Sequence, residues 1–313
     1  MREILEVIST LFPVFFIIGL GYVLNRINFL SHEGLENIRK IVFYISLPVL
    51  LFTSASNSSL SETFNPVVLG AVFVISLVMA VVIYLSAAKA SPSRRGVIVQ
   101  GTFRTNMVFV GLPIIAYAYG DAGLAAVVVL IAFLVPFFNF LAVIALSVPH
   151  YREPLGTTAV RKVIADIVMN PLVIGCSIGL IFSALGITLP SAVNRSCDLI
   201  GRLALPLALI MVGASLEFSQ LKGEMKISLA VSLLKLIIYP GMILLALVAF
   251  DQKGIALKAT VLMMAAPVSP SSYIMAVEMK GDGRLASALL VATTMFSMIT
   301  SVIWLTFFRW LPF

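Results

Sequence analysis

The chain has 313 residues, of which 60% are hydrophobic and only 11% charged, whereas soluble domains have about 25% charged residues. Apolar runs long enough to cross a hydrocarbon core of about 30 Å recur along its whole length, so the sequence predicts an all-α polytopic membrane protein. The net charge of +7 does not indicate nucleic-acid binding, because the basic residues fall in short loops between these runs.

The apolar runs predict ten transmembrane helices. They fall near residues 4–25, 37–56, 64–88, 95–119, 122–147, 160–184, 191–215, 227–249, 255–279 and 284–308. The first run lacks a small-residue cleavage site and is interpreted as a span rather than a signal peptide. The longest connection, about residues 148–158, divides the chain near its midpoint. Cys176 and Cys197 lie in or near apolar runs, so packing is expected for them rather than a disulfide or metal site.

Lys and Arg residues are distributed unequally between the loops. Numbered in chain order, the odd loops contain thirteen: Arg26, Arg39, Lys40, Lys89, Arg94, Arg95, Arg152, Arg161, Lys162, Lys222, Lys226, Lys280 and Arg284. The even loops and the termini contain five: Arg2, Arg195, Lys253, Lys258 and Arg309. Because cytoplasmic loops carry the excess of basic residues, we expect the odd loops in the cytoplasm and both termini outside.

Two short matches relate the halves of the chain. Leu47–Ser56 resembles Leu205–Ala214 at an offset of 158 residues, and Gly120–Ala126 resembles Gly281–Ser287 at an offset of 161. Their common order and similar offsets indicate a duplication of five spans, residues 1–150 and 151–313. Since five is odd, the second copy enters the membrane inverted, which is typical of inverted-repeat secondary transporters.

The ninth predicted span is interrupted within Met263–Asp282. Pro267 and Pro270 are expected to break the helix, because proline removes a backbone donor and clashes with the preceding turn. Small polar side chains and a tyrosine surround the two prolines: Ser269, Ser271, Ser272 and Tyr273. Broken backbone at membrane depth is tolerated only where protein or a water-filled cavity satisfies the freed groups. The break is therefore a candidate half of a solute-binding site.

The fourth predicted span supplies the corresponding half. Asn106, Gly111 and Pro113 interrupt its apolar sequence. Interrupted segments at corresponding places in two repeats indicate a transport site. We therefore expect helices four and nine to be broken and to cross at the site.

These motifs give the chain a resemblance to the auxin efflux carrier family, in its bacterial branch. The specific elements are Asn106-x4-Gly111-Leu-Pro113 in the fourth span and Ala266-Pro267-x5-Tyr273-x2-Ala276 in the ninth. Asn170-Pro171-Leu172, the Leu-Pro pair of the seventh span with Gly213-Ala-Ser-Leu, and Lys235 with Pro240 support it. The resemblance covers essentially the whole chain.

The resemblance implies a fold similar to that of the bile-acid sodium symporters. Helices 1, 2, 6 and 7 (about 4–56 and 160–215) would form a scaffold. Helices 3–5 and 8–10 (about 64–147 and 227–308) would form a moving transport domain. It further implies a homodimer through the scaffold in the bacterial cytoplasmic membrane. The solute would be a small organic anion, a mono- or dicarboxylate such as malonate, malate or an auxin-like acid, carried by alternating access.

A carboxylate at the membrane midplane must exchange its hydration for protein donors. Half-helix N-termini supply unpaired N–H groups and a partial positive charge, and Asn106 and the three serines add directional hydrogen bonds. The alternative is that these side chains only cap the breaks. Pro113, Pro267 and Pro270 are expected to shape the site, and Tyr273 either contacts solute or packs in the bundle.

Lys235 lies well inside its span, where an ionisable residue is a functional candidate. It would either neutralise the solute or hold the carbonyl end of the neighbouring broken helix. Arg104 precedes Asn106 by two residues and would attract anions, whereas Arg202 is expected to pair with Asp198 at i,i+4.

The driving force for transport stays open: the solute could be coupled to Na⁺, coupled to H⁺, or carried by facilitated diffusion. The sequence places no carboxylate deep in a span, and Gln100 and Asn139 are candidates for holding Na⁺ through neutral oxygens. No cofactor is expected. The alternative function is a sodium- or proton-coupled antiporter of the same fold. An enzyme is not expected: Gly175–Gly179 fits Gly-x-Ser-x-Gly but lies in an apolar helical run without a histidine base.

Overall fold

The computed structural model describes residues 2–56, 65–149 and 169–310, and these ranges are folded almost entirely into helices. Within them, seven helical stretches are long and apolar enough to cross a membrane. They are Leu5–Arg26, Glu33–Ser56, Pro66–Ser86, Met107–Ser147, Ser191–Ala214, Met225–Ala249 and Gly283–Trp310. The predicted all-helical, multi-pass membrane architecture is thereby confirmed.

The helices overlap the predicted spans in both halves of the chain, and several predicted spans are divided into two helices. The first half contains α1 (Arg2–Arg26), α2 (His32–Ile41), α3 (Leu47–Ser56), α5 (Pro66–Ser86), α6 (Pro92–Phe103) and α7 (Leu112–Ser147). The second half contains α9 (Pro171–Ala184), α10 (Ser191–Arg202), α11 (Ala204–Ala214), α12 (Met225–Leu233), α13 (Tyr239–Ala249), α14 (Gly254–Met264), α15 (Pro270–Glu278) and α16 (Gly283–Trp310). Short π-helical segments at Val42–Ser46, Met107–Gly111 and Leu234–Ile238 join α2 to α3, lead into α7, and join α12 to α13.

One predicted boundary between spans falls inside a single helix of the structure. The predicted end of the fourth span and start of the fifth fall inside α7, at Gly120, whose φ of 59° and ψ of −149° interrupt the helical backbone. Only glycine adopts such a conformation readily, so α7 consists of two helices that meet at this residue. The start of the predicted sixth span (160–168) and the predicted repeat boundary at residue 150 lie outside the described residues.

Prolines and asparagines mark where several helices begin. α5, α6, α9 and α15 each have proline in the first turn, where the missing amide hydrogen would have had no partner. Asn65 and Asn170 precede two of these prolines, and each side-chain oxygen accepts hydrogen bonds from backbone amides of the first turn. The sequence thus fixes these helix starts locally.

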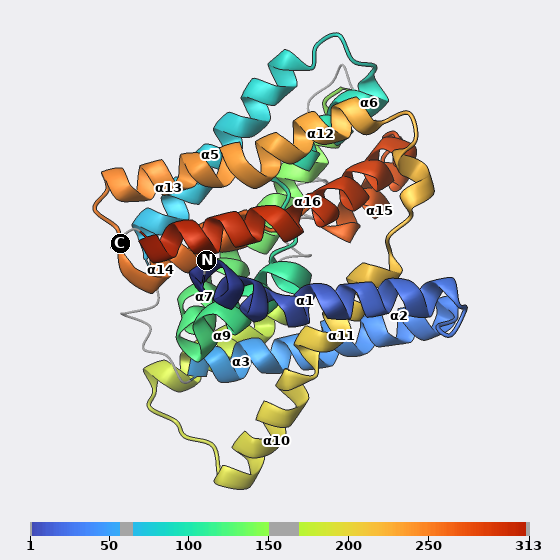
Figure 1. Cartoon of the computed structure of the whole chain (residues 1–313). Coiled ribbons are helices and arrows are strands. Elements are labelled where there is room, and N and C mark those ends of the chain that lie inside the picture. The colour runs from blue at the N-terminus through green and yellow to red at the C-terminus, as the bar shows by residue number, and fades with distance from the viewer. Residues whose placement is uncertain (1, 57–64, 150–168, 311–313) are drawn as a thin grey trace.

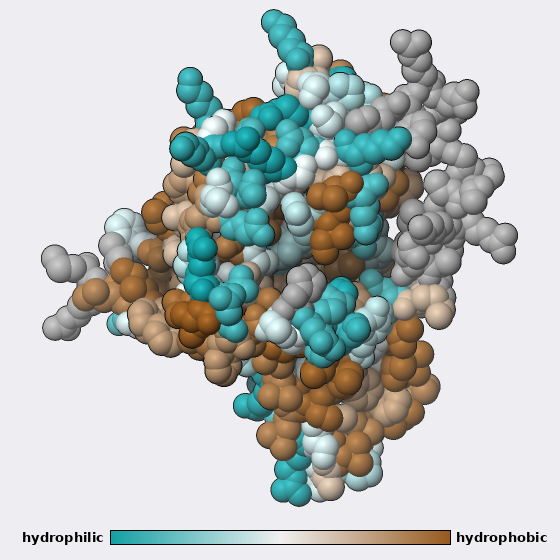
Figure 2. Space-filling view, turned by 90° about the vertical axis from the view of Figure 1, so that its right-hand side faces the viewer, coloured by the Kyte–Doolittle hydropathy of each residue, from teal (hydrophilic) through white to brown (hydrophobic). Residues whose placement is uncertain are grey.

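Of the loops that the sequence predicts to be cytoplasmic, those that the structure describes gather at one end of the molecule, and we call them the odd-numbered turns. In Figure 1, the turns from α1 to α2, from α5 to α6 and from α15 to α16 lie toward the right, whereas the turn from α13 to α14 lies toward the left. Figure 2 looks onto the right-hand end, where hydrophilic residues cover much of the surface. Arg309 of α16 donates to Glu6 of α1 over 2.6 Å. The first and last described helices therefore meet at the opposite end.

Helices α1 and α11 approach each other unusually closely. A Cβ atom placed on Gly21 would lie 2.1 Å from the carbonyl oxygen of Ile210, and one on Gly213 would lie 1.9 Å from that of Ile18. No side chain fits at these distances, so the two glycines allow backbone contact between the helices, as small residues commonly do in membranes.

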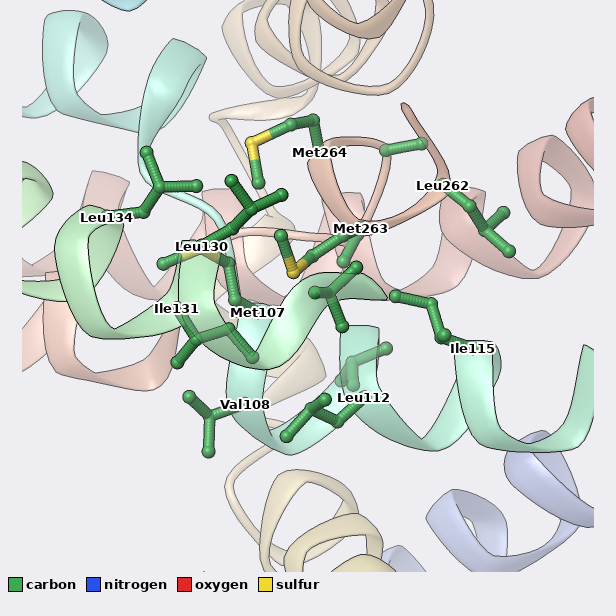
Figure 3. Packing of buried hydrophobic residues seen from close by; sticks show 14 of the residues in the cluster. Met107, Val108, Leu112, Ile115, Leu130, Ile131, Leu134, Leu262, Met263 and Met264 are labelled. Carbon is green, nitrogen blue, oxygen red and sulfur yellow. The ribbon is translucent and has the colours of Figure 1, made fainter. Parts of the chain in front are cut away.

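An apolar layer packs α7 against α14. Leu262, Met263 and Met264 at the end of α14 belong to one buried cluster with Met107 and Leu130, and Figure 3 shows these side chains together. The layer lies directly beside the ends of two helices, α6 and α14, and so supports the region where both are interrupted.

Candidate functional site

The two interrupted segments meet through backbone atoms. α6 ends at Phe103 and α14 at Met264, and each is followed by a short non-helical stretch. The amide of Asn106 donates to the carbonyl of Pro267 over 2.8 Å, and Thr105 and Val268 form an isolated antiparallel bridge. Segments about 160 residues apart in the sequence are thus joined where both helices are broken.

The first break includes the predicted residue Asn106 but not the predicted Gly111 and Pro113. The interruption lies at Arg104–Asn106, whereas Gly111 ends the π-helical segment and Pro113 lies in the first turn of α7. The prediction that Gly111 and Pro113 interrupt the helix is therefore wrong, because proline is tolerated in a first turn. A Cβ atom on Gly111 would lie 3.3 Å from the Cγ atom of Met263, so this glycine brings the two broken helices together.

Lys235 hydrogen-bonds to residues at both breaks. Its Nζ atom donates to the Met264 carbonyl over 2.6 Å and to Thr105 Oγ1 over 2.8 Å. It also lies 4.9 Å from the centre of the Tyr239 ring, and its side chain is fully buried. Of the two roles predicted for Lys235, this geometry corresponds to holding the carbonyl end of the broken helix. The lysine does not line the cavity described next.

A cavity of about 450 Å³ lies against the two breaks. Its walls are mostly apolar and include Phe43, Phe109, Val135, Phe138 and Ile274. Polar and charged side chains also line it: Glu36, Arg39, Arg104, Thr105, Asn106, Asn139, Asn170, Ser215, Ser269 and Ser271. The lining comes from α2, α7, α9, α11 and α15, near the odd-numbered turns, so the cavity belongs to that end of the molecule.

Arg104 lies in the first break and lines the cavity. It is 4% exposed, and its guanidinium donates to Asn139 Oδ1 over 2.7 Å and to Ser271 Oγ over 3.0 Å. These partners are neutral, and no carboxylate lies within salt-bridge distance of Arg104 among the residues that the structure describes. A buried, positively charged group without a carboxylate creates a strong local preference for an anion.

Asn106 combines both roles that the sequence left open for it. Its Oδ1 atom accepts from the amide of Phe109 over 3.1 Å and so caps the helix that leads into α7. Since the oxygen must face this amide, the orientation of the side chain is fixed. Its Nδ2 atom is buried and has no hydrogen-bond partner among the described residues. A buried donor without a partner calls for an explanation, and because Asn106 lines the cavity, this amide is a candidate donor to a bound anion.

The start of α15 presents hydroxyl groups to the same cavity. Ser269 precedes the helix without capping it through its side chain, and its Oγ atom instead lies 2.9 Å from Oγ of Ser271. The N-termini of α15 and of the segment leading into α7 both border the cavity. Their partial positive charges add to that of Arg104.

The structure brings six of the predicted site residues together: Arg104, Asn106, Asn139, Ser269, Pro270 and Ser271. The others lie outside the lining: Gln100, Gly111, Pro113, Lys235, Pro267, Ser272 and Tyr273. Gln100 is buried and donates to the carbonyl of Ser272 over 3.0 Å, whereas Tyr273 is 41% exposed. Gln100 therefore supports the break, and Tyr273 lies at the surface.

Sequence reasoning missed several lining residues. Arg39 and Glu36 form an ion pair on α2, and Arg39 had been counted only as a basic residue of a cytoplasmic loop. Asn170 was noted only in a motif that supports the resemblance, not as a site residue. A signal for it was present, because an Asn-Pro pair caps a helix N-terminus, and such termini bind anions.

The fold and the site together define a membrane transporter: a multi-pass helical bundle with a cationic cavity at interrupted helices. The match of a family model confirms this class. The chain belongs to the family described as "Membrane transport protein", whose model matches residues 6–153 and 156–305.

Relatives of similar length agree with this assignment. The chain is 25% identical over 303 residues to an uncharacterized transporter of Methanothermobacter thermautotrophicus, covering 95% of this chain and 96% of the relative. It is 21% identical to an uncharacterized transporter of Methanocaldococcus jannaschii, covering 93% and 95% respectively. It is 22% identical to a provisionally named malonate transporter of Rhizobium meliloti, covering 94% and 93%.

Proposed function

We propose that the protein is a secondary transporter for a small organic anion, a mono- or dicarboxylate such as malonate, malate or an auxin-like acid. The observation that carries the proposal is the cavity cation, Arg104, which hydrogen-bonds only to neutral groups in the described structure. A carboxylate entering the cavity supplies the missing negative charge. The unpartnered Nδ2 atom of Asn106 then donates to it.

The dimensions and walls of the cavity support this class of solute. Ligand sites commonly enclose about 300–1,000 Å³ and are mostly apolar with a few polar groups. The cavity volume of about 450 Å³ falls in this range. Its cation and helix N-termini suit a carboxylate, and its aromatic and aliphatic walls suit the carbon skeleton. The name of the Rhizobium meliloti relative refers to malonate, which makes malonate the first solute to test.

The proposed mechanism is alternating access by two inverted five-helix repeats, residues 1–150 and 151–313. In this mechanism helices four (α6 and the first part of α7) and nine (α14 and α15) cross at their breaks. The backbone link from Asn106 to Pro267 supports the crossing. Helices of residues 64–147 and 227–308 would move as a transport domain against a scaffold of residues 4–56 and 160–215.

The distribution of basic residues supports an orientation with the odd-numbered turns in the cytoplasm and both termini outside, in a bacterial cytoplasmic membrane. In this orientation the cavity lies at the cytoplasmic end, so the structure corresponds to the inward-facing state of the proposed cycle. Cytoplasmic reporter activity from fusions at both termini would contradict the orientation.

We further propose a homodimer through the scaffold, with α10 in the interface. Asp198 and Arg202 form an ion pair on α10 whose side chains are 54% and 74% exposed. Arg202 lies halfway along the span Ser191–Ala214, where charged groups face protein or water rather than lipid. A second copy would cover this pair. Cross-linking through the native Cys197 of α10 should give a dimer in membranes, and Cys197→Ser should abolish it; a monomeric mass in detergent with no cross-link contradicts the interface.

A sodium- or proton-coupled antiporter of the same fold is the second candidate. It is favoured by Gln100, whose Oε1 atom is buried without a hydrogen-bond partner in the described structure, because Na⁺ accepts neutral oxygen ligands. Solute flux that depends on an imposed Na⁺ or H⁺ gradient would support coupling, and flux driven by the solute gradient alone would support a uniporter.

Two measurements test the central proposal. A thermal-shift screen of small organic acids should identify ligands, because a ligand that binds the folded state raises its apparent stability. Counterflow of radiolabelled malonate, malate and indole-3-acetate into proteoliposomes then tests transport. Absence of both binding and counterflow for these acids, with correctly inserted protein, would refute the proposed function.

A further inference from the structure

A second cavity, of about 370 Å³, lies at the end of the molecule opposite the first. Its lining comes from α1, α7, α14 and α16 and includes Thr10, Tyr119, Lys258 and Arg309. The side chains of α1 belong to the predicted scaffold and the others to the predicted transport domain. This cavity therefore lies between the two parts that alternating access would move.

Two cations share this small space. Lys258 Nζ donates to the carbonyl of Phe308 over 3.2 Å, and Arg309 donates to Glu6 over 2.6 Å. A lysine ammonium has three donors and an arginine guanidinium has five, so both groups keep donors that no described residue occupies. Among the side chains that the structure describes here, one carboxylate faces two cations, which leaves a net positive charge.

The concentration of charge here is unexpected from the topology. The even loops and termini contain only Arg2, Arg195, Lys253, Lys258 and Arg309. Two of these five line one cavity, although basic residues are depleted on the outer side of a membrane protein. A positive cleft with low-dielectric walls raises the local concentration of anions.

We propose that this cavity is a second anion site, at which the transported carboxylate binds as it enters or leaves the protein. It lies on the side of the protein where the first and last described helices meet, which we call the terminal face. The inference rests on the proposed function. It places Lys258 and Arg309 as the groups that bind the carboxylate at this face, while Arg104 binds it at the opposite face. The same chemistry would also suit the phosphate of a lipid headgroup, and the test separates the two.

The test compares the two faces of the protein. Counterflow of malonate, malate and indole-3-acetate is measured in right-side-out and inside-out membrane vesicles for the wild type, Lys258→Gln and Arg309→Gln. Lys253→Gln is the matched control, since Lys253 directly precedes α14, the helix that contains Lys258, pairs with Asp251 and does not line the cavity. For solute supplied at the terminal face, each cavity variant should raise KM by about tenfold, the effect of losing a charged hydrogen bond. KM at the opposite face and for the control should stay within about twofold of wild type.

Each alternative outcome overturns the inference. KM unchanged at the terminal face, or raised equally at both faces, means that the cavity is not a sided solute site. An effect that appears in liposomes containing phosphatidylglycerol but not in liposomes of phosphatidylcholine alone assigns the cavity to a lipid headgroup. If one cavity variant fails to insert into the membrane, the KM values of the other variant still test the inference. Wild-type protein that transports none of the acids refutes the proposed function itself, whereas transport with unaltered sided KM refutes only this inference.

Discussion

Replacement of Arg104 by glutamine should lower solute affinity without lowering the stability of the empty protein. Glutamine retains a donor for Asn139 and Ser271, which accept from the guanidinium over 2.7 and 3.0 Å, but it removes the charge. A hydrogen bond to a charged group contributes about 1.5–3 kcal/mol. The variant should therefore bind a carboxylate about 10- to 150-fold more weakly.

The thermal stability of the solute-free protein should not fall with the affinity, but should stay the same or rise. Arg104 is 4% exposed and, in the described structure, hydrogen-bonds to neutral groups but pairs with no carboxylate, so its charge is buried without a counter-ion. Replacing such a group by a neutral one is often neutral or stabilising. The ligand-free melting temperature of Arg104→Gln should therefore equal or exceed that of wild type.

The assay measures both quantities on one preparation, by thermal shift over a titration of malonate in detergent. Arg104→Lys is the control, because it keeps the positive charge but loses the planar guanidinium that can bind a carboxylate through two donors. Its affinity should lie between those of wild type and Arg104→Gln. Unchanged affinity in Arg104→Gln, or a fall in affinity accompanied by a lower ligand-free melting temperature, would refute the reasoning.

Three further predictions concern support and packing. Lys235→Met should destabilise the protein by about 1–3 kcal/mol, because a buried carbonyl at the break loses its donor; an unchanged melting temperature in detergent would contradict this. Gly21→Ala should reduce the yield of monodisperse protein, because its Cβ would lie 2.1 Å from a carbonyl oxygen, whereas Gly19→Ala on the same helix meets nothing within 4 Å and should behave as wild type. Tyr273→Phe should leave solute affinity unchanged, since Tyr273 lies outside the cavity lining; a tenfold loss by thermal shift would place it at the site.

The predictable part of the fold depends on local signals. Apolar runs located the helices. Asn65 and Asn170, each followed by proline, cap helix starts in the structure, and such capping is local enough to be read from sequence. The ion pair between Asp198 and Arg202 was predicted from spacing alone and is confirmed. Cys176 is buried in the core, which agrees with the packing role predicted for it.

The less predictable part depends on which elements meet in space. The sequence identified Arg104, Asn106 and Ser271 near the breaks, but could not show that Arg39 lies in the same cavity, because α2 reaches it only through tertiary packing. For the first break it was correct for Asn106 and wrong for two other residues. Gly111 and Pro113 resemble an interruption, yet the helix ends earlier, where Asn106 forms a backbone hydrogen bond to a residue far away in the sequence.

The backbone link between the two breaks affects how solute preference can diverge among related proteins. The bond from the amide of Asn106 to the carbonyl of Pro267 involves no side-chain atoms, so substitutions elsewhere in the cavity do not remove it. Val135 and Phe138 of the wall can therefore be exchanged for larger or smaller residues while the junction is retained. Libraries restricted to wall positions should yield folded proteins with altered acid selectivity, which makes this junction a suitable fixed frame for specificity engineering.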